Sequence, residues 1–306
     1  MTLPDAYAPR LRRLRHDWQP LPDKPEETPE NTLLALWWTA AGSPRSAVAA
    51  GAAPDGGTPP ELDPHAEGRL DALLEQRIAG VPLAYLTGRQ HFLGLDLLAG
   101  PEALIPRAET ELLGRAVIDL ARDGDAATAI DVCTGCGNLA LALARHVDGI
   151  RVHGADLSPD AVELARRNAA MLALDDRVQF HDGDLLSPFD APAFHGAVDL
   201  VVCNPPYISS GKVASMAQEI SGHEPRLAFD GGPLGVSILT RLMQEAPRFL
   251  RRSGWLAFEV GAGQGAAMAR RLRNDGTWDE VRELADAGGT TRALLARRGG
   301  GTEAAA

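Results

Sequence analysis

The stretch AIDVCTGCGNLALALARH, residues 129–146, decides the fold. Residues 129–133 form a mostly apolar run with the length of a buried strand. Gly135 and Gly137 permit a tight turn and the close approach of a ligand to the backbone. Residues 138–146 continue with apolar side chains at helical spacing. The stretch therefore predicts a strand, a glycine turn and a helix, as in an open α/β sheet.

From about residue 108 onward, helix-like and strand-like segments alternate. Ser158 and Pro159 mark one helix start, because serine suits the N-cap and proline the first helical position. We expect helices over 108–122, 138–146, 159–170, 237–250 and 264–273, strands over 129–133, 150–156, 178–181, 199–203 and 254–260, and an antiparallel pair over 278–284 and 291–296. This order predicts the α/β class with a doubly wound, Rossmann-like sheet.

The first hundred residues have a different pattern. Residues 1–30 are rich in proline and charge, and we expect them to be partly irregular. Residues 31–41 and 66–79 have helical patterns on either side of a loop at 51–64, and residues 83–98 predict a β-hairpin. The chain is thus divided into a small helical N-terminal domain at 1–82, a β-hairpin linker at 83–107, an α/β domain at 108–298 and a disordered tail at 299–306.

The composition restricts the function classes. The chain has 306 residues, and a hydrophobic content of 45% supports a large core. Its 30 basic and 41 acidic residues give a net charge of −11, whereas a protein whose main task is to grip nucleic acid is usually basic. No apolar run has the length that crossing a bilayer requires, and three cysteines predict reduced thiols. We expect a cytoplasmic protein that contacts neither membrane nor nucleic acid directly.

Polar residues follow three of the predicted strands. The second strand ends in Asp156, which comes 156 − 137 = 19 residues after the last glycine of the turn. An acid about 20 residues after such a turn meets a ribose in many nucleotide sites. The third strand leads to Asp182-Gly183-Asp184-Leu185. Because ligands of open α/β sheets bind outside these strand ends, we expect one crevice there.

The fourth strand leads into an elbow, Asn204-Pro205-Pro206-Tyr207. Each proline biases the residue before it towards extended backbone, and neither offers an N–H. The elbow presents an asparagine amide, a backbone carbonyl and an aromatic face together, a set that suits a planar nitrogen carrying N–H groups. The competing interpretation is a proline-rich turn with an asparagine cap.

The same features favour S-adenosylmethionine (SAM) over a dinucleotide. A P-loop is absent, and the elbow has no role in hydride transfer, although Ala140 is tolerated at the third position of a dinucleotide fingerprint. Cys133 and Cys136 have the C-x-x-C spacing of metal sites, but a second ligand pair is missing, and we expect no metal.

The chain resembles the HemK/PrmC family, the protein-(glutamine-N5) methyltransferases that act on class I peptide-chain release factors. A sister branch with the same motifs methylates a ribosomal protein. The resemblance covers about residues 80–297, and its motifs are residues 88–95, 104–111, 131–137, 156–161, 204–208, 223–228 and 230–232. The chain departs from the family pattern at Ala108, where proline is usual, and at Cys136, where serine or threonine is usual. Residues 1–65 match no N-terminal motif of the family.

The resemblance implies roles for individual residues. It implies that Asp156 holds the ribose, and that Asp184 and Leu185 surround the adenine. Arg107 and Thr110 would close over SAM, and Asn204 would border it. The cofactor loop would be Cys133, Thr134, Gly135, Cys136 and Gly137, and the elbow of Asn204, Pro205, Pro206 and Tyr207 would hold the glutamine amide of a release factor.

The chemistry of an amide nitrogen predicts catalysis by positioning, because its lone pair is delocalised and no strong base lies in the elbow. We expect Asn204 Oδ1 and the Pro205 carbonyl to accept the two N–H groups, and Tyr207 to act through its ring face alone. Three alternatives remain: a base-amino methylase of DNA or RNA, a related enzyme that methylates another protein or a small molecule, and a SAM-binding regulatory module. His223 is interpreted as structural.

Overall fold

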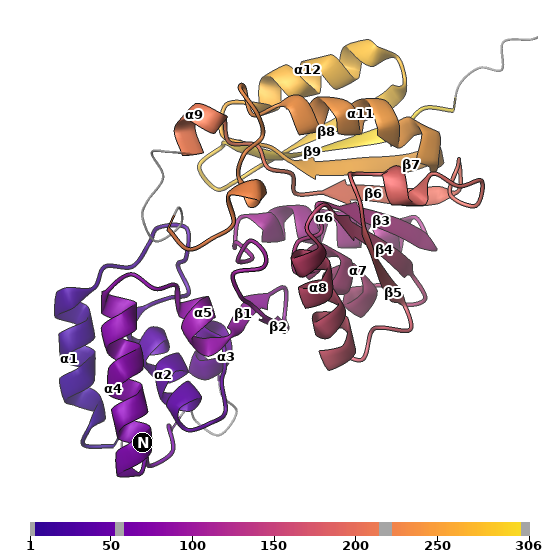
Figure 1. Ribbon diagram of the computed structural model, residues 1–306. Helices are drawn as coiled ribbons and strands as arrows, with labels where there is room; N and C mark the ends of the chain where they lie inside the picture. Colours follow the sequence, from indigo (N-terminus) through magenta and orange to yellow (C-terminus); the bar gives the residue numbers. More distant parts are fainter. Residues whose placement is uncertain (1–3, 53–57, 214–221, 301–306) are drawn as a thin grey trace, which may run out of the picture. The chain divides into compact units, whose positions relative to one another are not determined.

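The computed structural model describes residues 4–52, 58–213 and 222–300. The chain divides into two compact units (Figure 1). We call Met1–Ala108 together with Met216–Glu224 the N-terminal unit, and Glu109–Ser215 together with Pro225–Ala306 the sheet unit. The predicted tail lies outside the described residues except for Gly299 and Gly300.

The N-terminal unit is helical, with one hairpin. Its elements are α1 (Tyr7–Asp17), α2 (Pro29–Ala40), α3 (Ala47–Gly51), α4 (Pro64–Ile78), α5 (Leu83–Thr87), β1 (Arg89–Phe92) and β2 (Leu95–Leu98). Thr28 and Asp63 cap α2 and α4 by accepting from Asn31 N and Ala66 N, and each helix begins with a proline. These caps provide acceptors for backbone N–H groups that have no partner inside the helix.

One prediction for this unit is wrong. Residues 18–28 are irregular, as predicted for part of residues 1–30, whereas residues 7–17 form the regular helix α1, whose Tyr7 and Leu14 are buried in the core of the unit with Trp37. Residues 83–87 form the short helix α5, and only residues 89–98 form the antiparallel hairpin. Packing on one apolar core gives α1 its stability, because a helix this short is marginal alone.

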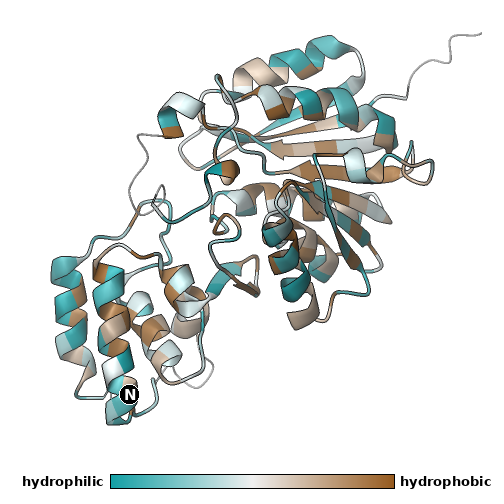
Figure 2. Ribbon diagram, viewed as in Figure 1, coloured by the Kyte–Doolittle hydropathy of each residue, from teal (hydrophilic) through white to brown (hydrophobic). Residues whose placement is uncertain are grey.

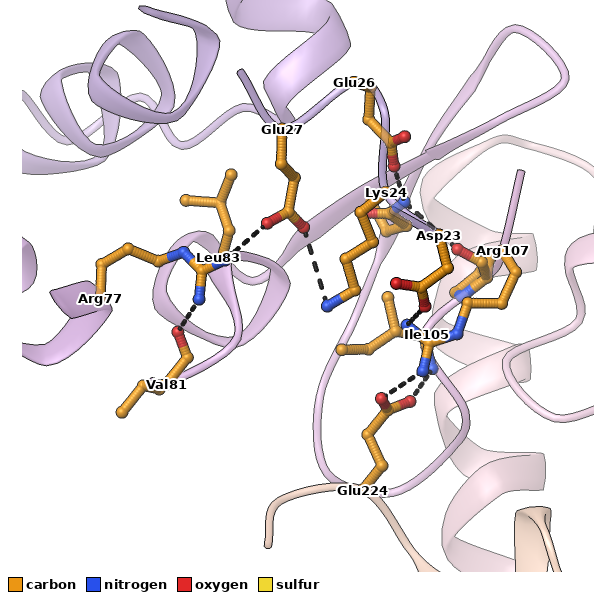
Figure 3. Close-up of polar contacts among 12 residues, drawn as sticks. Asp23, Lys24, Glu26, Glu27, Arg77, Val81, Leu83, Ile105, Arg107 and Glu224 are labelled. Carbon is orange, nitrogen blue, oxygen red and sulfur yellow. Dashed lines mark hydrogen bonds and ion pairs between the residues drawn. The ribbon is translucent and has the colours of Figure 1, made fainter. Parts of the chain in front are cut away.

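Charged side chains are buried inside the N-terminal unit (Figure 3). Arg77 donates from Nη2 to Glu27 Oε2 at 2.9 Å and from Nη1 to the Val81 carbonyl at 2.9 Å. Lys24 Nζ lies 3.9 Å from the other oxygen of Glu27. Arg77, Lys24 and Glu27 are each 2% exposed or less, so they form a buried ion network.

The sheet unit contains a seven-stranded sheet in the order β5-β4-β3-β6-β7-β9-β8. Its strands are β3 (Thr128–Val132), β4 (Arg151–Asp156), β5 (Val178–Asp182), β6 (Val198–Cys203), β7 (Leu250–Glu259), β8 (Trp278–Ala285) and β9 (Thr291–Arg298). The first five pair in parallel, whereas β9 pairs antiparallel with β7 and β8. The doubly wound α/β fold with an antiparallel end is confirmed.

Helices cover both faces of this sheet (Figure 1). They are α6 (Thr110–Asp123), α7 (Asn138–His146), α8 (Pro159–Met171), α11 (Ser237–Phe249) and α12 (Gly265–Asp275). The unit also contains the short helix α9 (Ser210–Val213) and the 3₁₀ turns η1 (Ser187–Phe189) and η2 (Arg226–Ala228). Figure 2 shows hydrophobic residues along the strands and hydrophilic residues on the outer faces of α11 and α12. The predicted start at Ser158 is confirmed, because its side chain accepts from Ala161 N. The order places the carboxyl ends of β3 to β7 at one edge of the sheet.

Candidate active site

The glycine turn after β3 has an unusual backbone. Cys133, Gly135 and Gly137 all have positive φ, at 56°, 55° and 84°. A Cβ added to Gly137 would lie 2.8 Å from Phe180 Cζ, so the turn leaves no space for a side chain there. The glycines that predicted this turn are therefore physically required by its backbone.

A buried acid, Asp131, holds this turn from inside. Its Oδ2 accepts from Thr134 Oγ1 at 2.6 Å and from Ala140 N at 3.2 Å. Burial raises the pKa of Asp131 to about 7. Asp131 belongs to the quoted fold motif but was not predicted as a site residue, because an acid inside an apolar run gives no indication of what it binds.

Asp156, at the end of β4, binds the same turn. Its Oδ2 accepts from Gly135 N at 2.9 Å, and its Oδ1 accepts from Ser158 N at 3.0 Å. Burial raises the pKa of this carboxyl. Each carboxylate oxygen still has lone-pair capacity for a second donor. The predicted ribose acid is thus adjacent to the glycine turn and fixed by backbone donors.

Leu185 and Asp184, the two residues predicted around an adenine, differ in their surroundings. Leu185 is buried in the core between α11 and the sheet, with φ of 49°. The Asp184 carboxylate accepts from Arg241 Nη1 at 3.0 and 3.2 Å. Asp184 also borders an open hollow of about 390 Å³, together with Asp190 and Phe249. The side chain of Leu185 therefore belongs to the hydrophobic core.

The elbow follows β6 and is tied to a buried acid that was not predicted, Glu259. Asn204 Nδ2 donates to Thr110 Oγ1 at 3.1 Å, and Thr110 Oγ1 donates to Glu259 Oε2 at 2.7 Å. Tyr207 donates from its hydroxyl to Glu259 Oε1 at 2.8 Å. We call Asn204, Thr110, Glu259 and Tyr207 the elbow network. Glu259 ends β7 and is 4% exposed.

The elbow network corrects one prediction about Tyr207. We expected the ring face alone to matter, but the hydroxyl donates to a buried carboxylate. Burial and the neighbouring Glu259 raise the pKa of Tyr207 above its ordinary value, so the hydroxyl keeps its proton. Removing the hydroxyl would leave Glu259 with one hydrogen-bond donor fewer.

The backbone of the elbow is braced by two loops. Ile208 N donates to the Phe229 carbonyl at 3.0 Å, and Gly231 N donates to the Ile208 carbonyl at 2.8 Å. Gln264 Nε2 donates to the Tyr207 carbonyl at 3.0 Å. In the part of the chain that the structure describes, neither Asn204 Oδ1 nor the Pro205 carbonyl accepts a hydrogen bond. The two predicted acceptors therefore have no hydrogen-bond donor within the described chain.

The remaining predicted residues are placed as follows. Thr110 begins α6 and joins the elbow network, whereas Arg107 lies in the N-terminal unit, where it pairs with Glu224 and Asp23 (Figure 3). The His223 carbonyl accepts from the Tyr85 hydroxyl at 3.5 Å in that same unit. Cys133, Cys136 and Cys203 are free, and burial raises the pKa of Cys136 to about 12. No three metal-ligating side chains gather among residues 4–52, 58–213 and 222–300.

Comparison with known proteins shows what class this fold represents. The family model "Methyltransferase small domain" matches residues 110–236. A crystal structure of the hMettl16 catalytic domain in complex with the MAT2A 3'UTR hairpin 6 is similar with a TM-score of 0.54 and 16% identity, over 76% of this chain and 83% of that one. This likeness shows that the chain has the class I fold of the SAM-dependent methyltransferases.

Curated relatives narrow the class to a family. A release factor glutamine methyltransferase of Moorella thermoacetica is 39% identical over 78% of this chain and 82% of its own length. The protein with the same name from Gloeobacter violaceus is 36% identical over 78% and 82%. The chain belongs to the family of the release factor glutamine methyltransferases.

Proposed function

We propose that this protein transfers a methyl group from SAM to the side-chain amide nitrogen of a glutamine in a class I peptide-chain release factor. The observation that carries the proposal is the elbow, where Asn204 Oδ1 and the Pro205 carbonyl accept no hydrogen bond from the described chain. A primary amide has two N–H groups on one nitrogen, which two such acceptors complement. The names of the relatives support the acceptor protein.

The sheet edge suits SAM as the cofactor. Asp156 is fixed at the end of β4 by backbone donors and keeps acceptor capacity for the ribose hydroxyls. The turn over 133–137 gives close access to its backbone. We assign the cofactor site to Cys133, Thr134, Gly135, Cys136, Gly137, Asp156, the backbone at Asp184 and Leu185, and Asn204. Bound there, SAM supplies a methyl group that its sulfonium makes electrophilic.

The residues of the elbow act by orientation. With its N–H groups held by Asn204 Oδ1 and the Pro205 carbonyl, the substrate nitrogen directs its lone pair out of the amide plane, towards the methyl group. Positive charge that develops on nitrogen is then met by two fixed acceptor dipoles. Tyr207 covers the amide plane with its ring. The nitrogen loses a proton after transfer, when it is strongly acidic.

The reaction is tested by incubating the protein with methyl-labelled SAM and, separately, a release factor, ribosomal proteins and free glutamine. We expect label on one glutamine side chain of the release factor, located by fragmentation mass spectrometry. If only a ribosomal protein or only free glutamine is labelled, that molecule is the substrate and the release factor is not. A transferred methyl on any group other than an amide nitrogen would contradict the role of the elbow.

Asp156→Asn should weaken SAM binding, because the variant removes the negative charge that accepts from ribose hydroxyls but keeps the side-chain shape. A hydrogen bond to a charged group contributes about 1.5–3 kcal/mol, so we expect a loss of roughly ten- to more than a hundredfold in affinity. Calorimetry with SAM measures it. Asp160→Asn, in the exposed first turn of α8, makes the same charge change and should bind normally. Equal affinity of the Asp156 variant and the wild type would refute the ribose assignment.

We further propose that the N-terminal unit holds the protein substrate. The elbow network and the glycine turn lie wholly in the sheet unit, whereas the N-terminal unit is a separate compact unit with an apolar core of its own. Adding release factor should therefore slow amide hydrogen exchange in α1, α2 or α4. Protection restricted to the sheet unit would contradict this role. The three free cysteines fit the reducing conditions of a cytoplasm, where we place the reaction.

In the described part of the chain, every helix is too short or too polar to cross a membrane.

A further inference from the structure

Glu259 is the centre of the elbow network. Each oxygen of its carboxylate accepts one hydrogen bond, from the Thr110 hydroxyl at 2.7 Å and from the Tyr207 hydroxyl at 2.8 Å. Glu259 and Thr110 are 4% and 1% exposed, so water does not compete for these bonds. Residues from α6, from the elbow and from β7 are thereby joined through one carboxylate.

The network has a direction, which follows from where its protons lie. Both carboxylate oxygens of Glu259 accept a hydrogen bond in the structure, and a threonine hydroxyl has one proton to donate. Thr110 gives this proton to Glu259, so its oxygen faces Asn204 as an acceptor. Only the NH₂ end of the Asn204 amide complements that oxygen. The two Thr110 contacts therefore fix which end of the Asn204 amide is Oδ1.

We propose that Glu259 is a positioning residue for methyl transfer, which through Thr110 sets the Asn204 amide with Oδ1 as the acceptor for the substrate N–H. This inference rests on the proposed function for its link to catalysis, but the amide orientation itself does not depend on the substrate. Glu259 touches neither substrate nor SAM in this scheme. Its second bond, to Tyr207, holds the ring that covers the substrate amide.

Removing the carboxylate reverses the direction of the network. In Glu259→Leu, the Thr110 proton loses its acceptor, and Asn204, at 3.1 Å, remains beside the hydroxyl as a hydrogen-bond partner. The amide then turns its Oδ1 to Thr110 and presents its NH₂ group to the substrate. Because the substrate N–H groups are donors as well, no hydrogen bond forms between them and Asn204. A wrongly placed catalytic group costs about a hundredfold in rate, and we expect a loss of that size.

The first test is single-turnover methyl transfer to the release factor with SAM saturating. Glu259→Leu should lower the rate about a hundredfold, and calorimetry should show SAM affinity within about threefold of wild type, a change of less than 1 kcal/mol. Thr110→Val should slow the wild type but should cause no further loss in the Glu259→Leu background, because Glu259 acts through Thr110. Thr110→Ser keeps the hydroxyl and should restore most of the rate. Glu283→Leu, on the exposed strand β8, is the matched control and should transfer normally.

The second test reads the Asn204 amide directly. Nitrogen-15 NMR of its side-chain NH₂ in the wild type should show slow exchange with water, and Glu259→Leu and Thr110→Val should both lose this protection. If Glu259→Leu transfers at the wild-type rate, or if its loss adds to that of Thr110→Val, the inference is overturned. If the wild type methylates no release factor, the proposed function fails, and the NMR comparison alone decides the inference about Glu259.

Discussion

Asn204→Ala should slow methyl transfer about a hundred- to a thousandfold, which is the usual cost of losing one preorganised partner at such a site. The variant removes Oδ1, one of the two acceptors proposed for the substrate N–H groups, and leaves the Pro205 carbonyl. It also leaves the Asp131 and Asp156 contacts of the glycine turn in place. SAM binding should therefore change far less than the rate. Single-turnover transfer with saturating SAM measures the chemical step.

The structure changes the expectation for Asn204→Asp. From the sequence, an aspartate appears the milder change, because it keeps an acceptor. In the structure, the Asn204 NH₂ donates to Thr110, whose proton already goes to Glu259. A carboxylate at 204 would face an acceptor and add charge beside Glu259. We now expect Asn204→Asp to be as slow as Asn204→Ala. Gln179→Ala, an exposed amide on β5, is the control and should keep the wild-type rate. A near-normal rate for Asn204→Ala would mean that the elbow is only a proline-rich turn.

The sheet could be predicted because its signals are local. The apolar run before Gly135 and the Ser158-Pro159 helix start both have physical causes within a few residues. The helix α1 lacked such a signal, since its stability comes from burying Tyr7 and Leu14 against distant residues of the same unit. Residues 83–87 form α5 instead of a strand, and Thr87 Oγ1 donates to the Leu83 carbonyl there at 3.1 Å. Five residues are too few for periodicity to distinguish these structures.

The sequence could predict only those site residues that directly follow a recognisable buried strand. Asn204 and Asp156 are visible because unusual residues follow a buried strand. Glu259 also ends a buried strand, and this was the one signal that could have identified it. Its partners depend on the pairing of β6 with β7, in which Cys203 lies opposite Phe258. That register places Glu259 beside the elbow, and no local pattern in the sequence predicts which residues of β6 and β7 pair.

Arg77→Ala should destabilise the N-terminal unit by about 3–5 kcal/mol, because it breaks a buried ion pair and takes from the Glu27 carboxylate its hydrogen-bonded cation, at 2.9 Å. Arg77 is fully buried, donates to Glu27 and to the Val81 carbonyl, and lies 4.5 Å from the centre of the Trp18 ring. After the change, Lys24 still lies 3.9 Å from the Glu27 carboxylate. Urea unfolding followed by tryptophan fluorescence measures the effect.

Two comparisons separate the buried charge from simple loss of packing. Arg15→Ala breaks an exposed pair with Glu30 and should cost less than about 1 kcal/mol, because solvent screens such pairs. Arg77→Met combined with Glu27→Leu and Lys24→Met removes all three charges of the buried ion network and fills part of the space. It should recover much of the stability that Arg77→Ala loses, since replacing buried ion pairs by apolar groups is often neutral. If the triple variant is as unstable as Arg77→Ala, the cost comes from packing around Trp18 and not from the buried charge of Glu27.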